Sequence, residues 1–325
     1  MKRATFIGLF ASALLLPFLS CAQAAGDYPN RQVRVVVPYP AGGPADLIAR
    51  ILAQKLSEGL GKSFYVENIV GASGAVGTGQ VAQAPPDGYT LLVATNDFAV
   101  ASVTNANLPY DPVKNFTPVT IVASSPQVVA VNPSVPAKTM KELIALLTAA
   151  PDKYSYASLG IGFGQLSAQR LFELGLKLDK VVRVPFNGAA PAVNSTLAGD
   201  TQIVFLGLPP VAPHLKSGAL RALAVTSRAR SEQFPDIPTL QEAGVPNQES
   251  DLMIGLLAPA GTPAAIVTTL RDEVAKIVNL PDVRSTLNTV SFQAVASTPA
   301  EYAAQIKDDI AVWGQVMKDA HIPVN

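Results

Sequence analysis

The sequence predicts an α/β protein of two domains, each a mostly parallel sheet flanked by helices, with a cleft between them. Runs of β-branched and apolar residues of strand length recur along the chain, and several are followed by a glycine loop and a helical pattern. This arrangement occurs within residues 33–50 and again within residues 154–174, which indicates two sets of β-α units. The length of 325 residues is enough for two ordinary domains.

Residues 1–24 have the pattern of a secretory signal peptide. Two basic residues precede an apolar run over residues 6–19, and the small residues Ala22 and Ala24 form a cleavage site. The run is too short to span a membrane comfortably, and no later stretch approaches that length. We therefore expect an exported protein that is cleaved near Ala24. The alternative is a lipoprotein in which Cys21 is the lipidated first residue.

The composition is that of a globular protein, with 49% hydrophobic and 15% charged residues. Without the leader the chain has 22 basic and 24 acidic residues, a net charge of −2. Its basic residues are scattered, so no nucleic-acid surface is predicted. The cleaved chain has no thiol, and His214 and His321 are its only histidines. This excludes disulfides and clusters of histidine or cysteine ligands, and we expect no metal and no cofactor.

The first predicted strand, residues 33–37, leads into the loop that organises the chain. Prolines and glycines end the strand, and Pro44 fits the first position of a helix, where its missing N–H costs nothing. Asp46 falls in the first helical turn, where an acidic side chain suits the helix dipole. Such a junction presents free backbone N–H groups to an anion. The alternative is that Gly42 and Gly43 only permit a tight turn.

The first domain continues with the same elements. A strand over residues 63–68 leads to a second glycine loop within residues 70–79 and a short helix. A third strand, residues 89–95, ends in small polar residues at the start of another predicted helix. Two apolar runs of β type, residues 119–123 and 127–131, flank a Ser-Ser-Pro link. We place the first crossing between the domains at this link.

The second domain repeats the pattern. A capping box opens a helix at residues 139–150, and the strand at residues 154–158 is followed by three glycines within 160–164 and a helix at 165–174. The remaining predicted elements are strands at 181–186, 202–206, 220–227 and 253–258, and helices at 191–198, near 213–217, from 262 to about 278 and from 298 onward. Small residues end two of these strands, at Asn187-Gly188 and at Gly207.

Motifs of catalysis are missing from the sequence. It has no G-x-S-x-G elbow, no G-x-G-x-x-G dinucleotide fingerprint and no Walker lysine after a glycine loop. The glycine loops contain no basic residue, yet each feeds a helix N-terminus whose backbone N–H groups could hold a carboxylate. In open parallel sheets ligands lie beyond the carboxyl ends of the strands, so two facing sheets would place these loops around one cleft. The sequence therefore predicts binding and not catalysis.

Five segments, in this order, resemble one known family: VPYPAGGPADLIARILAQKLSEGLGKSFYVEN, GASGAVGTGQVAQAPPDGYTLLVAT, VPFNGAAPAVNSTLAGD, SGALRALAVTSRARSEQFPDIPTLQEAGVP and GLLAPAGTP. The chain closely resembles the solute-binding proteins of tripartite tricarboxylate transporters, the Bug-type periplasmic receptors. The resemblance covers nearly all of residues 28–322.

The resemblance implies a periplasmic binding protein, type II-like, that closes on its ligand between two hinged domains. The chain then crosses between the domains twice, so that residues 25–126 and 252–325 form one domain and residues 127–251 the other. It also implies a small organic carboxylate as ligand, membrane transporter subunits as partners and a monomer. The ligand is held mainly by backbone amides of two β-α loops and by ordered water.

Together, the glycine loops, the polar strand ends and the family's two loops define the candidate ligand-binding residues. They are Tyr39, Ala41, Gly42, Gly43, Asp46, Ser73, Thr95, Asn96, Ser158, Gly160, Gly162, Phe163, Gly164, Gln165, Asn187 and Gly207.

Some positions depart from the family's pattern. The second loop has Phe163, Gly164 and Leu166 where the family often has small hydroxyl residues followed by His, and Met253 stands where a Trp is common. With Phe163 at the rim of the pocket, an aromatic or monocarboxylate ligand is favoured over a citrate-like polyacid. The alternative is that this ring turns into the core.

Two other functions remain open at this point. A ligand-sensing protein that acts on a signalling partner needs the same closing cleft. A secreted enzyme on the same plan is the second alternative, against which the lack of a nucleophile–histidine pair counts.

Overall fold

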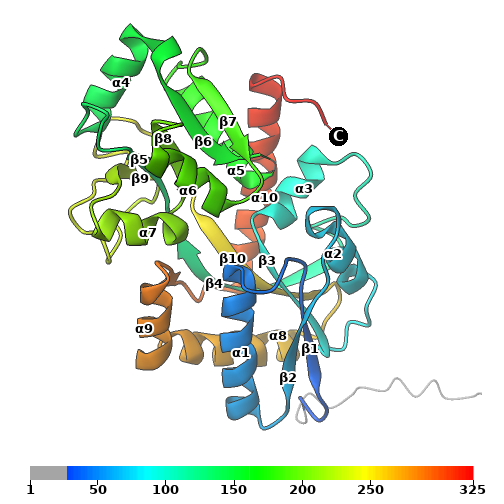
Figure 1. Cartoon of the computed structure of the whole chain (residues 1–325). Helices are drawn as coiled ribbons and strands as arrows, with labels where there is room; N and C mark the ends of the chain where they lie inside the picture. The colour runs from blue at the N-terminus through cyan, green and yellow to red at the C-terminus, as the bar shows by residue number, and fades with distance from the viewer. Residues whose placement is uncertain (1–27, 161, 325) are drawn as a thin grey trace, which may run out of the picture.

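The computed structural model describes residues 28–160 and 162–324 (Figure 1). The expected signal peptide, its cleavage site and the alternative lipid attachment at Cys21 all lie outside these residues. Within the described part of the chain, no helix has the length and apolar composition that crossing a bilayer requires.

The strands form two sheets. The strands of the first sheet are β1 (Val33–Val37), β2 (Phe64–Asn68), β3 (Thr90–Thr95), β4 (Phe116–Ser125), β10 (Leu252–Pro259) and β11 (Gln293–Ala294). Those of the second are β5 (Gln127–Val131), β6 (Ser155–Leu159), β7 (Val182–Phe186), β8 (Ile203–Gly207) and β9 (Arg221–Val225). The spatial orders are β11-β4-β10-β3-β1-β2 and β7-β6-β8-β5-β9. The second sheet lies above the first in Figure 1.

Helices cover both sheets. Those around the first sheet are α1 (Pro44–Leu60), α2 (Ala75–Ala82), α3 (Asp97–Thr104), α8 (Ala264–Val278), α9 (Pro281–Thr289) and α10 (Pro299–Asp319). Those around the second are α4 (Met140–Ala149), α5 (Phe163–Gln169), α6 (Ala189–Ala198) and α7 (Leu208–Lys216). Short helical turns are η2 (Ala72–Gly74), η3 (Pro151–Lys153) and the π-helical turn η4 (Arg170–Gly175), which continues α5.

Local sequence sets the helix ends as expected. Pro44 occupies the start of α1, and Gly61 ends it in the left-handed conformation with φ of 70°, donating its N–H to Ser57. Thr298 and Glu301 form a complete capping box at the start of α10. The predicted helix at 165–174 is present but begins earlier, at Phe163, and changes to π geometry at Arg170.

The two-domain α/β fold class is confirmed, and the sheets within it are mixed. Parallel pairs join β1 to β2 and β3, and β6 to β7 and β8. β10 runs antiparallel to β3 and β4, and β5 runs antiparallel to β8 and β9. The carboxyl ends of the parallel strands face the other domain. A strand that arrives from that domain must run the opposite way, so each crossing introduces an antiparallel strand.

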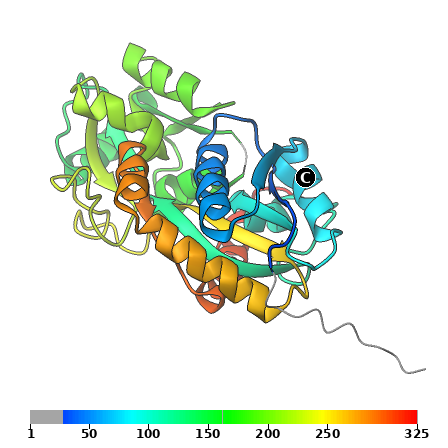
Figure 2. The ribbon, with the colours of Figure 1, turned by 90° about the horizontal axis from the view of Figure 1, so that it is seen from below.

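Apolar side chains fill both faces of each sheet. On one face of the first sheet, α1 and α8 lie side by side (Figure 2), and α1 contributes Ile48, Leu52 and Leu56 to this core. The opposite face packs against α2, α3 and α10. Segments around α4 and α5 cover one face of the second sheet, and α6 and α7 cover the other. A smaller cluster joins α3, α5 and α10 across the two domains.

Buried polar contacts hold the crossings between the sheets together. A single residue, Pro126, separates β4 from β5. Beside it, Gln127 donates from Nε2 to the carbonyl oxygen of Ser250 at 2.9 Å, and its backbone N–H donates to Thr226 Oγ1 at 2.9 Å. Ser167 Oγ donates to Gln127 Oε1 at 3.2 Å. β4 and β10 belong to the first sheet, and β5 and β9 belong to the second. This supports the domain boundaries that we propose after residues 126 and 251.

Candidate ligand-binding cleft

A hollow of about 430 Å³ lies where the loops of the two domains face each other. It lies at the carboxyl ends of β1, β6 and β7 and at the loop before α2, the location in which open α/β sheets bind ligands. The residues that line it are Pro38, Tyr39, Pro40, Val70, Gly71, Ala72, Ser73, Gly74, Asp97, Leu159, Gly160, Gly162, Phe186, Asn187 and Gly188.

Four helices begin at this hollow. Gly74, Gly162 and Gly188 are the N-cap residues of α2, α5 and α6, and Asp97 is the first residue of α3. No N-cap side chain of these four helices makes a capping hydrogen bond. Gly162 and Gly188 have φ of 75° and 131°, which a residue with a Cβ rarely adopts. The hollow is therefore surrounded by backbone N–H groups and the positive ends of helix dipoles.

Side chains from the first domain form a hydrogen-bonded group at the edge of the hollow. Thr95 Oγ1 lies 2.9 Å from the Tyr39 hydroxyl, to which it donates, and 3.3 Å from Asp97 Oδ2. Asp97 Oδ1 accepts the backbone N–H of Phe163, from the second domain, at 2.9 Å. Burial raises the pKa of Asp97, against the opposing effect of the bonds from Phe163 and Thr95. Burial and the nearby Asp97 likewise raise the pKa of Tyr39.

Asp46 holds the first glycine loop and does not line the hollow, contrary to the sequence-based expectation. Its Oδ2 accepts the N–H of Gly42 and the Nε–H of Arg50, both at 2.9 Å, and its Oδ1 accepts from Asn68 at 2.9 Å. Burial alone would raise the pKa of this carboxyl, but the bonds from Arg50, Gly42 and Asn68 lower it to about 2. Because three donors already bind its oxygens, Asp46 holds the conformation of the loop at Gly42 and does not contact a ligand in the hollow.

Phe163 is also placed differently from the expected position at the pocket rim. Its side chain is only 5% exposed and packs edge-on against Trp313 of α10, with ring centroids 5.2 Å apart. Burying the ring between the domains removes more apolar surface from water than a position at an open rim would. The aromatic side chains that do line the hollow are Tyr39 and Phe186.

The sixteen predicted site residues divide into two groups. Tyr39, Ser73, Gly160, Gly162 and Asn187 line the hollow, whereas Ala41, Gly42, Gly43, Asp46, Thr95, Asn96, Ser158, Phe163, Gly164, Gln165 and Gly207 are not among its lining residues. Thr95 still contributes, because it hydrogen-bonds two side chains that line the hollow.

Asn96 has a structural role in this arrangement. Its Oδ1 accepts the N–H of Met253 at 2.6 Å, and its Nδ2 lies 3.4 Å from Asp309 Oδ2, so it ties α3 to β10 and α10. Ser158 is fully buried, and Gly207 is the N-cap residue of α7.

Sequence reasoning missed several residues of the hollow, most importantly Asp97 and Phe186. Asp97 directly follows the predicted strand end at Thr95 and Asn96, and Phe186 directly precedes Asn187. Residues next to a strand end lie at the same edge of the sheet. Both residues could therefore have been predicted from their position beside a candidate residue.

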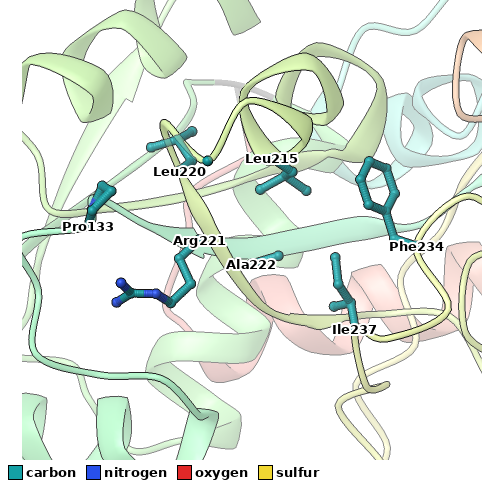
Figure 3. A pocket seen from close by; sticks show the side chains of 8 residues that line it. Pro133, Leu215, Leu220, Arg221, Ala222, Phe234 and Ile237 are labelled. Atoms are coloured by element: carbon teal, nitrogen blue, oxygen red, sulfur yellow. The ribbon is translucent and has the colours of Figure 1, made fainter.

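Two further hollows lie away from the glycine loops. One, of about 320 Å³, lies beside the start of β9, where Leu215, Phe234 and Ile237 surround an apolar surface and Arg221 lies at the edge (Figure 3). The other, of about 600 Å³, runs along α10 and includes Asp251 and Asp309. Two of the predicted site residues, Asn96 and Phe163, line this second hollow. Within the described chain, no group of three His, Cys, Asp or Glu side chains could hold a metal ion.

The fold and the cleft define a two-domain solute-binding protein, and comparison with known proteins agrees. The sequence model of the family described as "Tripartite tricarboxylate transporter family receptor" matches residues 48–322. Protein BugT of Bordetella pertussis is 32% identical over 300 residues, which are 91% of this chain and 91% of BugT. The chain belongs to the tripartite tricarboxylate transporter receptor family.

Solved structures of similar proteins include two from Rhodopseudomonas palustris. Rpa4515, solved with adipate, is 33% identical with a TM-score of 0.78, covering 91% of this chain and 99% of its own. MatC, solved with bound malate, is 31% identical with a TM-score of 0.74, covering 89% and 99%. Both identities lie well above the level at which only the fold is shared.

Proposed function

We propose that this protein captures a small organic carboxylate in the 430 Å³ hollow and delivers it to the membrane subunits of a tripartite tricarboxylate transporter. One observation carries the proposal: none of the four helices that begin at the hollow is capped by its own N-cap side chain, and no Lys or Arg lines the hollow. The adipate and malate in the structures of Rpa4515 and MatC support a carboxylate as the ligand class.

Backbone N–H groups would carry out the recognition. A carboxylate accepts several hydrogen bonds, and the N–H groups at helix starts lie in the positive end of the dipole, so they bind it without a basic side chain. The hollow contains Gly160, Gly162 and Gly188, which leave the backbone uncovered. Tyr39 and Phe186 supply apolar surface for the body of the ligand.

Movement about the crossings at Gln127 and Ser250 would let ligand enter and leave. When the domains close, water leaves the hollow and the hydrogen bonds between amide and carboxylate strengthen as the local dielectric constant falls. Such closure is also what a membrane partner could recognise. We further propose that the protein is exported to the periplasm, cleaved near Ala24 and monomeric.

Thermal unfolding of the cleaved protein against a panel of carboxylic acids tests the binding role. Adipate, malate and aromatic monocarboxylates belong in the panel, together with neutral amides of the same acids as controls. A ligand that binds only the folded state at 100 times its Kd adds about 2.7 kcal/mol of stability and raises the midpoint. If no acid shifts the midpoint more than its amide does, the proposal fails.

A matched pair of variants connects binding to the hollow. Gly188→Val adds a branched side chain at a helix start that lines the hollow. The control, Gly218→Val, adds the same side chain away from this hollow, at a position where no atom lies within 4 Å of the new Cβ. Both glycines have positive φ, so both variants bear backbone strain. Calorimetry should show a loss of affinity of at least tenfold for Gly188→Val alone.

A further inference from the structure

The lining of the hollow includes one acidic side chain, that of Asp97, and no basic one. This is unexpected in a site that binds carboxylates, because a carboxylate repels a second one nearby. Asp97 is the first residue of α3, where the helix dipole favours a negative charge. Its presence therefore constrains what kind of acid the hollow accepts.

The backbone opposite is shaped around this carboxylate. Asp97 Oδ1 accepts the Phe163 N–H at 2.9 Å, and a Cβ added at Gly162 would collide with the same oxygen. Gly162 also has φ of 75°, so glycine is required there twice over. The position of Asp97 therefore depends on its place at the start of α3 in the first domain and on the lack of a side chain at Gly162 in the second.

The acceptor capacity of Asp97 is only partly used. A carboxylate has about four lone-pair positions, and within the described chain Asp97 receives the Phe163 N–H, while Thr95 Oγ1, which donates to Tyr39, lies 3.3 Å from its Oδ2. No Lys, Arg or His of the described chain lies within 4.0 Å of it. A partly buried carboxylate without a cation is costly unless further donors reach it.

We infer that Asp97 selects carboxylates that carry a hydrogen-bond donor, an ammonium, hydroxyl or amide group, and rejects those that would place a second carboxylate beside it. The inference rests on the proposed function and specifies its substrate class. The helix starts hold one carboxylate, and the donor group of the same ligand fills the open lone pairs of Asp97. A plain dicarboxylate of equal length has only acceptor oxygens at its far end and supplies no donor there.

A role in holding the domains together is the structural alternative for Asp97, since its bond to Phe163 joins them. That role would affect all ligands equally, because domain closure is common to all of them. Selection between ligands is the property that separates the two roles.

The test is calorimetry with acids of matched length and different far ends. The four-carbon set is 4-aminobutyrate, 4-hydroxybutyrate and succinate, and the six-carbon set is 6-aminohexanoate and adipate. In the set whose chain length fits the hollow, the wild-type protein should bind the amino or hydroxy acid at least tenfold more tightly than the dicarboxylate.

Asp97→Asn removes the charge and keeps an oxygen that can accept the Phe163 N–H. It should lower the preference for the amino acid over the dicarboxylate at least tenfold. Asp97→Ser, a second neutral variant, should do the same, and Asp152→Asn removes an exposed acid of the second domain as the control. Thermal midpoints of all variants establish that they fold.

The outcomes separate the inference from the function on which it rests. If dicarboxylates bind the wild type as tightly as the amino and hydroxy acids, or if Asp97→Asn weakens all acids by one factor, the selection by Asp97 is wrong and carboxylate binding stands. If none of the five acids binds either protein while the broader panel of acids also fails, the proposed function is wrong and the inference with it.

Discussion

The ring of Phe163 lies edge-on to the indole of Trp313, with the two planes at 89° and the centroids 5.2 Å apart. Phe163 is the first residue of α5 in the second domain, and Trp313 lies on α10, the last helix of the chain. Arg170 lies 5.5 Å from the centre of the Trp313 ring system on the side of the second domain. Apolar packing of this kind helps to determine how the two domains sit against each other.

Phe163→Ala should therefore destabilise the protein instead of changing its ligand preference. Truncation of a buried Phe costs about 3–5 kcal/mol of unfolding free energy. Phe163→Leu, which keeps an apolar side chain of similar reach, should lose much less. Denaturant unfolding measures the loss, and calorimetry with an aromatic acid and a small dicarboxylate should show equal factors for both ligands. A loss of affinity for the aromatic acid alone would show that the Phe163 side chain contacts the ligand.

Gly162→Ala should force the domains apart. A Cβ at this position collides with the Asp97 carboxylate, and alanine is unfavourable at the positive φ of residue 162. The contact between Asp97 and Phe163 therefore cannot form as described. Small-angle scattering should report a larger radius of gyration than for wild type, and affinity for the ligand should fall at least tenfold. Gly218→Ala has a positive φ with open space around it and serves as the control. Unchanged scattering and affinity would contradict the prediction.

Asp46→Asn should lower stability at neutral pH but not at low pH. The folded-state pKa of Asp46 is lowered to about 2 from the ordinary 3.8 of an aspartate, so its charge stabilises the fold above pH 4. That contribution, on the order of 2 kcal/mol from the size of the shift, is lost as the pH falls through 2. Unfolding at pH 7 should separate the variant from wild type, and unfolding near pH 2 should bring them together. A constant difference at both pH values would show that packing, not charge, is lost.

Asp309→Asn should raise stability above pH 6. Burial raises the pKa of Asp309 to about 6, against the opposing bonds from Gln305 and Asn96. An acid whose pKa is raised on folding favours the folded state at low pH, and this advantage is lost as the pH rises from about 4 through 6. The variant should show a flatter pH profile of unfolding free energy than wild type. Asp152→Asn, which removes an exposed acid of the second domain, is the control and should leave the profile as it is.

The fold class and most elements could be predicted from local pattern. Valine-rich runs ended by Pro and Gly mark β1, and the capping box at Thr298 marks the start of α10. The helix α9 was missed because only Val283 and Leu287 of its nine residues are buried, too few for a clear period. The antiparallel strands were missed because strand direction follows from the crossings between domains, which no short window contains.

The candidate site could be located, but the roles of its side chains could not. Glycine loops predict free backbone N–H groups, and five of the predicted residues do line the hollow. The inward direction of Phe163 depends on Trp313, which lies 150 positions later and comes from the other domain. Asp46 looked available for a ligand because its partner Asn68 belongs to the next strand. Such choices are made by tertiary contacts between distant segments.

The bond between Gln127 and Ser250 means that the second domain begins and ends at nearly the same point in space. Ser125 of β4 lies opposite Leu252 of β10 in the register of the first sheet, so the ends left by removing the second domain face each other across one antiparallel pair. A two-residue turn would join them as an ordinary hairpin. The second sheet and its helices are therefore inserted between two neighbouring strands of the first sheet, whose chain path does not depend on them.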